Sequence, residues 1–455
     1  MRRRWALATL AGLVGCRAEV PATPHARAPV PIPVAVKPFR MARPDVVLLV
    51  TGGTNGMLEV CNCRGPMPGG LARRSGLVRS YRAAFGNTLL IDTGDAFWVE
   101  PNDLRNEFLL KGYAQIGYDA VVLGDQEWAA DSRRLARLQA ATGLTYLSTN
   151  VSADGVETVP LVRREVGGTR VAILSDVPRD SFHFVPGERV AQLGMSGSAA
   201  VGDRIAELKK AGFLVVLVAH MGSEALEACA PASAADLILR GHTTRSEPKL
   251  LRIGGKPVVK VGGSETVGAV ALKVRDGRIA EMDYRVEVVD TSWPLDKRLI
   301  QTYQAYAHAA MRRALDAERK AGLQYVSSAE CGRCHRAPYA AWKAGPHARA
   351  YKTLQRVRRT GDPNCLMCHT SGFGTKQGFR TFAKTPRLAG VNCQDCHRFN
   401  EPEHHRKGFR FPPVSKDVCT TCHTPVTDPK FQYGKRLPKV RCPPARAASA
   451  ERNSS

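Results

Sequence analysis

Short runs of apolar residues, separated by longer mixed stretches, mark the chain from residue 45 to residue 290. Each run has the length and content of a buried β-strand: Val46–Val50, Thr88–Asp92, Asp119–Leu123, Val171–Leu174, Phe213–Ala219 and Asp236–Leu239. Between them, Leu104–Ile116 and Val201–Ala211 have the pattern of helices. Alternating strands and helices predict an α/β domain. Turns at Gly167-Gly168 and Asp276-Gly277 predict hairpins, so we expect mixed sheets.

The pattern changes twice after residue 290. Asp296–Gly322 predicts one long polar helix, within a connector that spans residues 291–326. From Ser327 onward cysteine, histidine, glycine and proline dominate and the periodicity fades. This predicts a mostly helical and irregular second domain over residues 327–444. The small polar residues from Ala445 predict a disordered tail over residues 445–455.

The N-terminus has the layout of an export signal. A basic start, Arg2–Arg4, precedes a short apolar run, Trp5–Val14, that is too short to span a bilayer. The run ends in Leu-Val-Gly-Cys16, which resembles the lipobox of bacterial lipoproteins. The resemblance implies a signal peptide over residues 1–15, a lipid on Cys16 and a proline- and alanine-rich linker over residues 16–44. The alternative is an ordinary cleaved signal with an incidental cysteine. In both cases we expect an exported protein, periplasmic or attached to the outer membrane and facing the periplasm or the surface.

Composition adds two constraints. A chain of 455 residues, 44% hydrophobic and 24% charged, is typical of a globular protein with two or three domains. The formal net charge of +25 is spread along the chain without aromatic interleaving, so we do not expect nucleic acid as a partner. A positive charge of this size favours binding to acidic partners or to an anionic membrane surface. The alternative is that the charge only keeps the protein soluble.

Eight of the thirteen cysteines fall in four copies of one pattern, Cys-x-x-Cys-His. The copies are Cys331, Cys334 and His335; Cys365, Cys368 and His369; Cys393, Cys396 and His397; and Cys419, Cys422 and His423. Two thiols at this spacing can add to both vinyl groups of one haem, and the following histidine supplies an iron ligand. One copy is also compatible with half a zinc site, but four close together predict four covalently bound c-type haems. Such attachment occurs outside the cytoplasm, in agreement with the export signal.

The second axial ligand of each haem has few candidates. Beyond the motif histidines, residues 327–444 contain only His347, His404 and His405. We expect these histidines to be distal ligands, with exposed surface histidines as the alternative; His404 and His405 are adjacent, which makes it awkward for both to serve. Three candidates for four haems leave at least one haem that needs His308 of the connector, another ligand, or an open position.

The second domain resembles the tetrahaem c-type cytochromes of nitrogen-cycle electron transfer. Besides the haem motifs, the resemblance rests on Trp342-Lys-Ala-Gly-Pro-His347, on Gly390-Val-Asn-Cys393, and on a histidine placed after the third motif as a distal ligand is in that family. It covers roughly residues 327–444. The resemblance implies haems stacked in closely spaced pairs that pass electrons, with one haem five-coordinate.

A second set of motifs lies in the first domain, each at the end of a strand. They are Gly69-Gly-Leu-Ala-Arg73, Ile91-Asp-Thr-Gly-Asp95, Gly124-Asp-Gln-Glu127, Ala219-His220 and Gly241-His-Thr-Thr244. Their order and spacing resemble the 5′-nucleotidase branch of the metallophosphoesterases. The resemblance implies a layered α/β sandwich with mixed sheets over residues 45–290. It also implies two metal ions, about 3.5–4 Å apart, that activate water against a phosphoryl group.

The ligand set that this resemblance implies is incomplete here. The first metal of the family maps to Gly53, Asn55, Asp95 and Thr244, where three of the four ligands are missing. The second metal maps to Asp95, Asp125, His220 and His242, a complete set with aspartate in place of asparagine. Gln126 stands where the family has a histidine that protonates the leaving group. We therefore expect at most one divalent ion, Zn, Mn or Fe, the alternative being four residues that only hydrogen-bond one another.

Cysteines outside the haem motifs raise a separate question. Cys61 and Cys63 are too close to bridge each other without strain, so we expect one of them to form a structural disulfide with Cys229. The alternative is a thiolate that binds a soft metal or takes part in redox chemistry. Cys442 has no evident partner in the sequence.

Together these features predict an exported, lipid-anchored multihaem c-type cytochrome for electron transfer, fused to a metallophosphoesterase-like domain with an altered site. The expected partners are redox proteins, the membrane through the lipid anchor, and a small anionic ligand. One alternative is an active phosphoesterase or 5′-nucleotidase-like hydrolase with an attached redox module. A second alternative is a redox enzyme that acts on a small nitrogen or sulfur compound at an open haem. The motifs favour electron transfer over catalysis.

Overall fold

The computed structural model describes most of the chain beyond residue 31. The described residues are 32–60, 67–98, 103–129, 131–183, 185–229, 233–242, 248–317, 325–375, 377–399, 404–406, 408–411, 413–424, 427–428 and 430–443. The predictions that concern the signal peptide, Cys16, Cys61, Cys63, Thr244 and the C-terminal tail lie outside them. Within these ranges, no helix has both the length and the apolar character that a membrane span requires.

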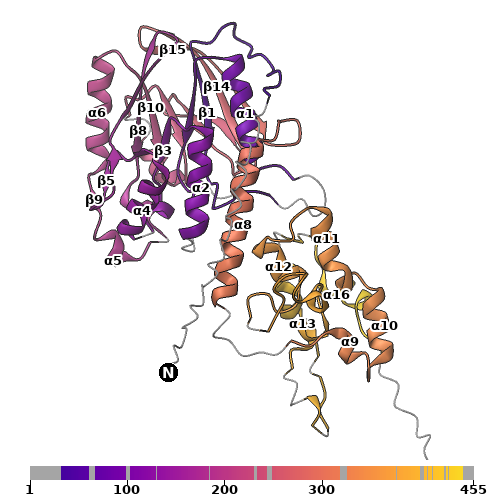
Figure 1. Ribbon diagram of the computed structural model, residues 1–455. Helices are drawn as coiled ribbons and strands as arrows, with labels where there is room; N and C mark the ends of the chain where they lie inside the picture. Colours follow the sequence, from indigo (N-terminus) through magenta and orange to yellow (C-terminus); the bar gives the residue numbers. More distant parts are fainter. Residues whose placement is uncertain are drawn as a thin grey trace, which may run out of the picture.

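Two mixed β-sheets form the first domain (Figure 1). The seven-stranded sheet has the order β15-β14-β1-β2-β3-β4-β6: Arg278–Val288, Thr266–Arg275, Val46–Thr51, Thr88–Asp92, Ala120–Val122, Tyr146–Leu147 and Thr158–Val159. The six-stranded sheet has the order β12-β13-β11-β10-β8-β7: Lys249–Ile253, Lys256–Lys260, Leu237–Arg240, Leu214–Ala219, Thr169–Asp176 and Val162–Val166. A small ribbon pairs β5 (Val151–Ser152) with β9 (Gly194–Met195). The predicted α/β fold with mixed sheets is confirmed.

The six predicted strands correspond to β1, β2, β3, β8, β10 and β11, which pair in parallel within each sheet. The two predicted hairpins are also present, because β7 pairs antiparallel with β8 and β14 with β15. Parallel pairing places the carboxyl ends of the central strands at one edge of each sheet. Polar motifs that are far apart along the chain therefore lie close together in space.

The core of the first domain is layered as helix, sheet, sheet, helix. In β1, Val47 and Leu49 face the helices while Val46, Leu48 and Val50 face the other sheet, as the two-residue period of a strand requires. Helices α1 (Leu71–Ala84) and α2 (Asp103–Ile116) cover the outer face of the seven-stranded sheet. Helices α6 (Ser198–Lys210) and α7 (Ser223–Cys229) cover the six-stranded sheet. The shorter helices are α3 (Asp125–Trp128), α4 (Ser132–Thr142) and α5 (Gly187–Val190).

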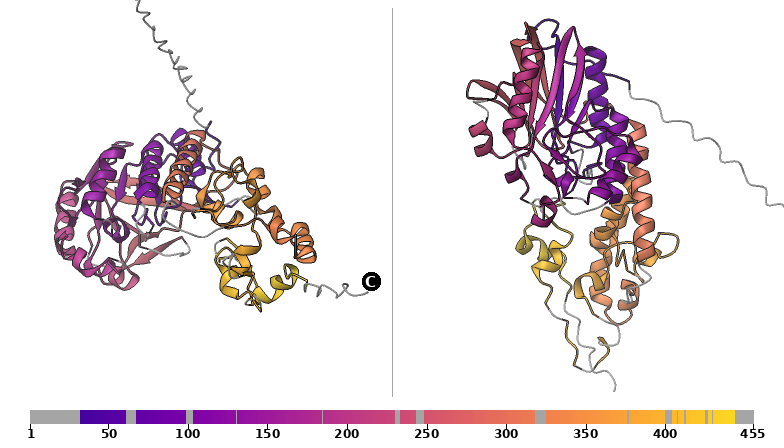
Figure 2. Two further views of the ribbon diagram at one scale, coloured as in Figure 1. Left: turned by 60° about the horizontal axis from the view of Figure 1, so that its bottom comes forward. Right: turned by 90° about the vertical axis from the view of Figure 1, so that its left-hand side faces the viewer.

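The predicted connector helix is α8 (Lys297–Ala317), and it is more than a spacer. It packs against α1 and α2, and Leu299, Tyr303 and Tyr306 are buried in the same apolar core as those helices. Its far end points toward the second domain (Figure 1). The turned views in Figure 2 show α8 beside the first domain in the same way. The helix therefore belongs structurally to the first domain.

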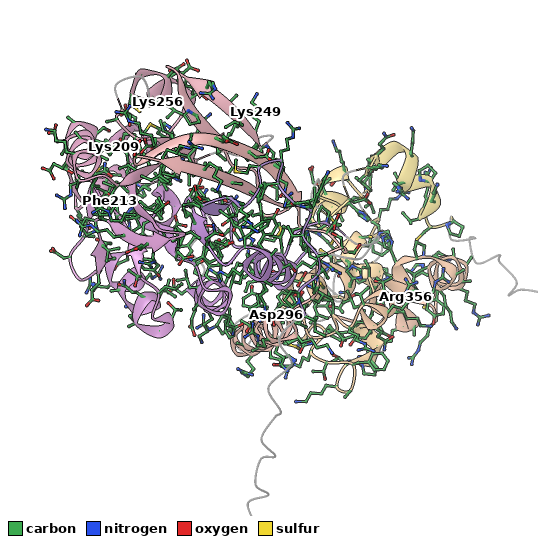
Figure 3. The ribbon with its side chains drawn as sticks, turned by 90° about the horizontal axis from the view of Figure 1, so that it is seen from above. Lys209, Phe213, Lys249, Lys256, Asp296 and Arg356 are labelled. Atoms are coloured by element: carbon green, nitrogen blue, oxygen red, sulfur yellow. The ribbon has the colours of Figure 1, made fainter. Side chains whose placement is uncertain are left out.

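The second domain consists of short helices joined by irregular segments. The helices are α9 (Ser328–Cys331), α10 (Arg336–Ala344), α11 (Ala350–Arg356), α12 (Pro363–His369), α13 (Cys393–His397), α15 (Lys416–Thr420) and α16 (Tyr433–Arg436). Its apolar core is small: Tyr351, Leu354, Leu366, Phe379 and Leu388. Seen from above, it lies beside the first domain, with Arg356 on its surface and Lys249 and Lys256 on the first domain (Figure 3). So small a core agrees with a domain whose interior is completed by packed cofactors.

Gly76 provides a test of the packing between α1 and the segment that leads into α8. A Cβ at Gly76 would lie 1.9 Å from the Pro294 carbonyl oxygen, whereas a Cβ at Gly202 in α6 would meet nothing within 4 Å. We predict that Gly76→Ala lowers the free energy of unfolding by about 1–3 kcal/mol because it overpacks this contact. Gly202→Ala should raise it by about 0.5–1 kcal/mol, the helix-propensity gain. Urea denaturation followed by circular dichroism measures both, and equal effects would contradict the packing described.

Candidate metal centre and haem-attachment sites

Four side chains converge where the two sheets meet at the carboxyl ends of their strands. They are the four residues predicted as metal ligands, and their ligand atoms all lie within 4.8 Å of one another: Asp95, Asp125, His220 and His242. Asp95 follows β2 and Asp125 follows β3 in one sheet, while His220 follows β10 and His242 follows β11 in the other. The site is thus assembled from both sheets, so it requires the complete sandwich.

The carboxylates and imidazoles of this cluster point at one another. His220 Nε2 lies 3.0 Å from Asp125 Oδ1 and 3.4 Å from Asp95 Oδ1. His242 Nδ1 lies 3.1 Å from Asp125 Oδ1 and 4.0 Å from Asp95 Oδ2. His220 Nδ1 donates to the Thr93 carbonyl oxygen at 2.8 Å, which fixes the ring and directs Nε2 to the carboxylates. A backbone partner of this kind orients histidines that ligate metals.

Three motif glycines enclose the His220 ring. A Cβ at Gly124 would lie 2.4 Å from His220 Cε1, and a Cβ at Gly94 or Gly241 would lie 2.8 Å or 2.9 Å from His220 Nδ1. Each of these glycines belongs to a different motif of the sequence. The imidazole therefore occupies a space that exists only because all three positions lack a side chain. This explains physically why glycine precedes Asp95, Asp125 and His242.

Glu127 holds the two acidic segments together from behind. Its carboxylate accepts hydrogen bonds from the backbone N–H groups of Asp95 at 3.1 Å, Gly124 at 2.8 Å and Phe97 at 2.9 Å. Burial, together with the neighbouring charge of Asp95, raises the pKa of Glu127 to about 7. Glu127 is therefore a supporting residue that positions Asp95 and Asp125 rather than a ligand.

The electrostatics of the cluster fit a bound cation. Burial alone would raise the pKa of Asp125, but the hydrogen bonds and charges of His220 and His242 outweigh it and hold that pKa below its ordinary range. Burial would lower the pKa of His220, yet Asp95 and Asp125 raise it well above its ordinary value. Asp125 Oδ2 is buried and has no hydrogen-bond partner among the described residues. Two carboxylates, two imidazoles and an unpartnered buried oxygen make a suitable donor set for one Zn, Mn or Fe ion.

The positions of a first metal ion lack such a donor set. Gly53 has no side chain, and the Asn55 side-chain amide donates to the Gly53 carbonyl oxygen at 2.9 Å. Thr244 lies outside the described residues. Gln126 is buried beside the cluster with its Oε1 unpartnered among the described residues, and an amide neither gives nor takes a proton near neutral pH. The structure thus brings the second-metal residues together, and among the described first-metal positions it leaves only the shared Asp95 of the ligands that the family uses.

Sequence reasoning missed one histidine beside this site. The ring centroid of His183 lies 5.9 Å from that of His242, on the segment after β8. His183 belongs to no motif, and the only signal in the sequence was a histidine soon after the carboxyl end of a buried strand. Cys229 also differs from expectation, because it carries a free thiol whose Sγ lies 3.5 Å from Met221 Sδ. The disulfide that we expected between Cys229 and Cys61 or Cys63, two residues outside the described ranges, is therefore not formed.

In the second domain, each Cys-x-x-Cys-His motif begins in a helical turn with a suitable N-cap residue. The N-caps are Ser327, Asp362, Asn392 and Ser415, all of residue types that favour helix starts. Asp362 accepts from the Asn364 backbone N–H at 3.0 Å, and Asn392 forms a capping box with Asp395. A helical turn brings cysteines three residues apart onto one face, as attachment to a single haem requires.

Hydrogen bonds between thiols show which motifs are neighbours. Cys331 of the first motif shares one with Cys393 of the third, and Cys368 of the second shares one with Cys422 of the fourth. His335 and His404 rings lie 5.7 Å apart, and Phe411 contacts both His397 and His404. The first motif therefore lies beside the third, and the second beside the fourth.

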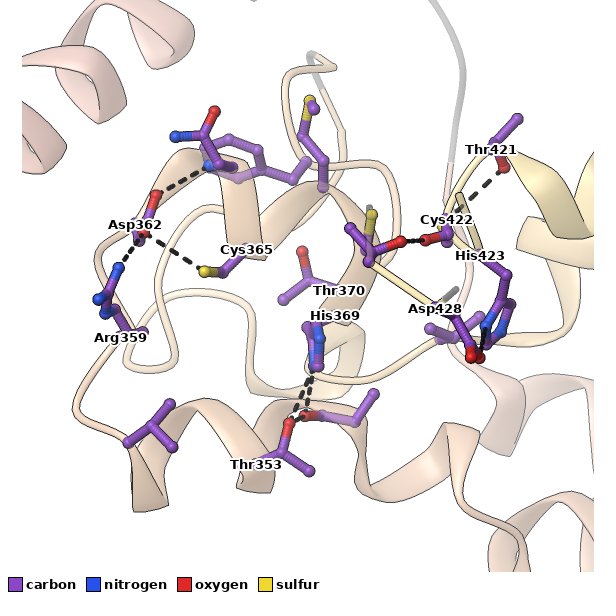
Figure 4. Close-up of a pocket in the computed structure, with 18 of the residues that line it drawn as sticks. Thr353, Arg359, Asp362, Cys365, His369, Thr370, Thr421, Cys422, His423 and Asp428 are labelled. Carbon is purple, nitrogen blue, oxygen red and sulfur yellow. Dashed lines mark hydrogen bonds and ion pairs between the residues drawn. The ribbon is translucent and has the colours of Figure 1, made fainter. Parts of the chain in front are cut away.

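The second and fourth motifs have histidines oriented by their Nδ1 atoms (Figure 4). His369 Nδ1 donates to the Ala350 carbonyl oxygen at 2.8 Å, and His423 Nδ1 donates to Asp428 Oδ2 at 2.9 Å. Both hydrogen bonds leave Nε2 available as a ligand, the arrangement that metal-binding histidines use. The His347 and His423 rings lie 6.3 Å apart. His347 and His423 would hold one haem iron between them if His347 is a distal ligand, as the sequence predicts.

These positions fit haem, although the assignment of individual ligands stays a prediction. His347 faces His423, and His404 faces His335. His405 contacts the His404 ring at 5.1 Å and is exposed. His308 is also exposed, beside Gly361. A cavity of about 1760 Å³ contains the cysteines and histidines of the second and fourth motifs, and it extends to the first domain.

Comparison with known proteins agrees with this division of the chain. Residues 330–398 match the family model of cytochrome c554 and c-prime. Cytochrome c-554 of Nitrosomonas europaea is 31% identical over 151 aligned residues, which cover 24% of this chain and 64% of that protein. The chain thus spans somewhat less than two thirds of this relative.

The first domain is similar to solved hydrolase structures. They include a 5′-nucleotidase precursor from Thermus thermophilus, with a TM-score of 0.51 and 21% identity over 61% of this chain and 60% of that chain. The sulfate thiohydrolase SoxB of the same organism has a TM-score of 0.53 and 19% identity. This match covers 65% of this chain and 64% of the SoxB chain. The chain fuses a 5′-nucleotidase-like fold to a cytochrome c554-like module. At these identities the solved structures show the fold of the first domain and nothing of its chemistry.

The 5′-nucleotidase-like domain should bind one divalent ion through its clustered residues. We predict one Zn or Mn ion per chain by mass spectrometry after dialysis, in the wild type and in Gly202→Ala. Gly124→Ala should bind less than a tenth as much, because its Cβ would displace the His220 ring. Asp95 and Asp125 raise the pKa of His220, and the ion binds the neutral imidazole, so its affinity should rise with pH. Full occupancy in Gly124→Ala would contradict this site.

Proposed function

We propose that the protein is an exported multihaem c-type cytochrome that transfers single electrons. We further propose that its first domain binds one divalent metal ion and has lost two-metal hydrolysis. The observation that carries the proposal is the set of four Cys-x-x-Cys-His motifs, each of which begins in a helical turn. The match of residues 330–398 to the cytochrome c554 family supports covalently bound haem in this module.

Haem iron, when bound, supplies a one-electron couple between its ferric and ferrous states. The residues of the module would set the reduction potential of that couple through the groups that accept hydrogen bonds from the ligand histidines. The Asp428 carboxylate accepts from His423 Nδ1, whereas the neutral Ala350 carbonyl oxygen accepts from His369 Nδ1. A carboxylate partner raises the basicity of the ligand more than a carbonyl does, and it favours the ferric state. We therefore expect the fourth-motif site to have a lower reduction potential than the second-motif site.

Export, a lipid on Cys16 and attachment to a membrane complete the proposed setting. The resemblance of residues 13–16 to a lipobox supports the anchor, and haem attachment of this type supports a location outside the cytoplasm. The proposed partners are soluble or membrane-bound redox proteins, whose acidic surfaces would match the net charge of +25. The altered metal site supports a further role in binding a small anionic ligand.

The number of haems is the first test of this function. We predict four haems per chain from the pyridine haemochrome spectrum and the intact mass. The double variant Cys365→Ala/Cys368→Ala should retain three, while Cys229→Ala, a change at a free thiol outside the motifs, should retain four. Fewer than four haems in the wild type would contradict the proposal.

Asp428 tests the tuning of a single haem. Asp428→Asn removes the charge but keeps an oxygen that can accept from His423 Nδ1. We predict that a potentiometric titration shows one of four potentials shifted upward by about 50 mV, roughly a tenfold change in a one-electron equilibrium. Asp417→Asn, which removes a carboxylate on α15 away from the His423 hydrogen bond, is the control and should leave all four unchanged. A shift of all potentials, or of none, would contradict the assignment.

Loss of hydrolysis follows from the site. One ion cannot stabilise both the attacking and the leaving oxygen as two ions do, and Gln126 cannot protonate a leaving group. We predict that the Mn- or Zn-loaded protein hydrolyses phosphodiesters and nucleoside monophosphates no faster than His220→Ala does. Clear turnover that His220→Ala abolishes would favour a working phosphoesterase instead.

A further inference from the structure

A second cavity of the first domain lies at the edge of the six-stranded sheet opposite to the candidate metal centre. Asp236, which lines it, precedes the amino end of β11. His220 and His242 instead follow the carboxyl ends of β10 and β11, two strands that run parallel. A strand rises about 3.3 Å per residue, so the six residues of β10 place about 20 Å between its two ends. The cavity is therefore distinct from the metal centre.

Lys209 of α6 and Asp236 form an ion pair in the wall of this cavity. Lys209 Nζ lies 2.7 Å from both carboxylate oxygens, and the two side chains are only 20% and 10% exposed. Lys209 Nζ also donates to the carbonyl oxygens of Phe213 at 3.3 Å and Gly277 at 2.7 Å. The Val215 backbone N–H donates to Asp236 Oδ2 at 2.8 Å. The protein thus provides all the partners of Lys209, and Asp236 cancels its charge.

Three further cations line the cavity: Arg252, Lys256 and Arg278. The first two belong to the hairpin of β12 and β13, and Arg278 begins β15. Among the described residues that line the cavity, Asp236 is the one carboxylate. None of the three cations forms an ion pair with a carboxylate in the described part of the chain. Their charges are therefore left uncompensated there.

The volume and lining of the cavity suit a small organic anion. Its volume is about 590 Å³, within the roughly 300–1,000 Å³ of a typical small-molecule pocket. A guanidinium group binds phosphate through two parallel hydrogen bonds, and a lysine adds a point charge. A diphosphate carries about three negative charges near neutral pH, which matches the three cations. Pro257, Ile279 and Met282 line the same cavity, so an uncharged part of the ligand would find apolar contacts.

We propose that this cavity binds a small organic diphosphate, with Arg252, Lys256 and Arg278 around its phosphate groups. Phospholipid headgroups share the phosphate chemistry, but a cavity of this volume fits a free small molecule. Figure 3 shows Lys209 and Lys256 on the side of the first domain that faces away from the second domain. The ligand would therefore bind far from the haem-attachment motifs. The inference goes beyond the proposed electron transfer and depends neither on the haems nor on the metal ion.

Isothermal titration calorimetry of the haem-loaded full chain with adenosine diphosphate tests this site. We expect one binding event per chain, about tenfold tighter than that of inorganic pyrophosphate, which lacks the apolar part. The double variant Lys256→Gln/Arg278→Gln should weaken the binding of both probes about tenfold or more. Lys352→Gln/Arg356→Gln removes the same charges from exposed positions of α11 and should bind as the wild type does. Equal thermal unfolding midpoints of the two double variants show that both are folded.

Several results would overturn the inference. No binding to the wild type would remove the site, and equal weakening in the two double variants would show that net charge alone attracts the probe. Loss of binding after the metal ion is removed with EDTA would place the diphosphate at the metal centre instead.

Two further controls test the chemistry of the ligand. Citrate that binds as tightly as adenosine diphosphate would show that the cavity does not select phosphate. Cosedimentation with phosphatidylglycerol vesicles that requires Lys256 and Arg278, without binding of either diphosphate, would assign these cations to a lipid headgroup. Either result would overturn the inference and leave the proposed electron transfer intact, because the haem count and the reduction potentials are measured separately.

Discussion

One buried carboxylate, that of Asp362, determines how the two halves of the chain are joined. Its oxygens receive the Asn364 backbone N–H, the Tyr303 hydroxyl and the Arg359 guanidinium, and they lie beside the Cys365 thiol. A buried charge left without partners costs about 3–5 kcal/mol. Asn364 and Arg359 belong to the haem module, whereas Tyr303 belongs to α8, and Arg359 also donates to the Val60 carbonyl oxygen. Partners from both halves therefore surround this carboxylate, and the two halves are joined by a buried polar contact in addition to the connecting chain.

The packing of the first domain by itself accounts for several of its strand-end motifs. His220 requires glycine at three separate positions and a carbonyl acceptor at Thr93. Glu127 requires three backbone donors from the segments that carry Asp95 and Asp125. These constraints concern the folded sandwich whether or not a phosphoester is bound. They are met by the residues of the folded domain without reference to a reaction.

Much of this organisation could be predicted from the sequence because it follows from local patterns. Apolar runs gave the central strands, and four identical motifs gave the haem-attachment sites. The resemblance of the strand-end motifs to the metallophosphoesterases implied that Asp95, Asp125, His220 and His242 lie together, and within each sheet parallel strands bring one pair to the same edge. The packing of α8 was not predicted, because Leu299, Tyr303 and Tyr306 are a narrow stripe on a polar helix. The Tyr303–Asp362 contact joins residues 59 apart in sequence and has no periodic signature. His183 reaches the site from a loop without any motif.

The central claim is that a haem lies against the first domain, and iron anomalous diffraction from crystals of the haem-loaded full chain tests it most directly. The account predicts four iron positions, one of them beside His369 in the cavity that the first domain also lines. It would be contradicted by fewer than four iron positions, or by four of which none lies in that cavity.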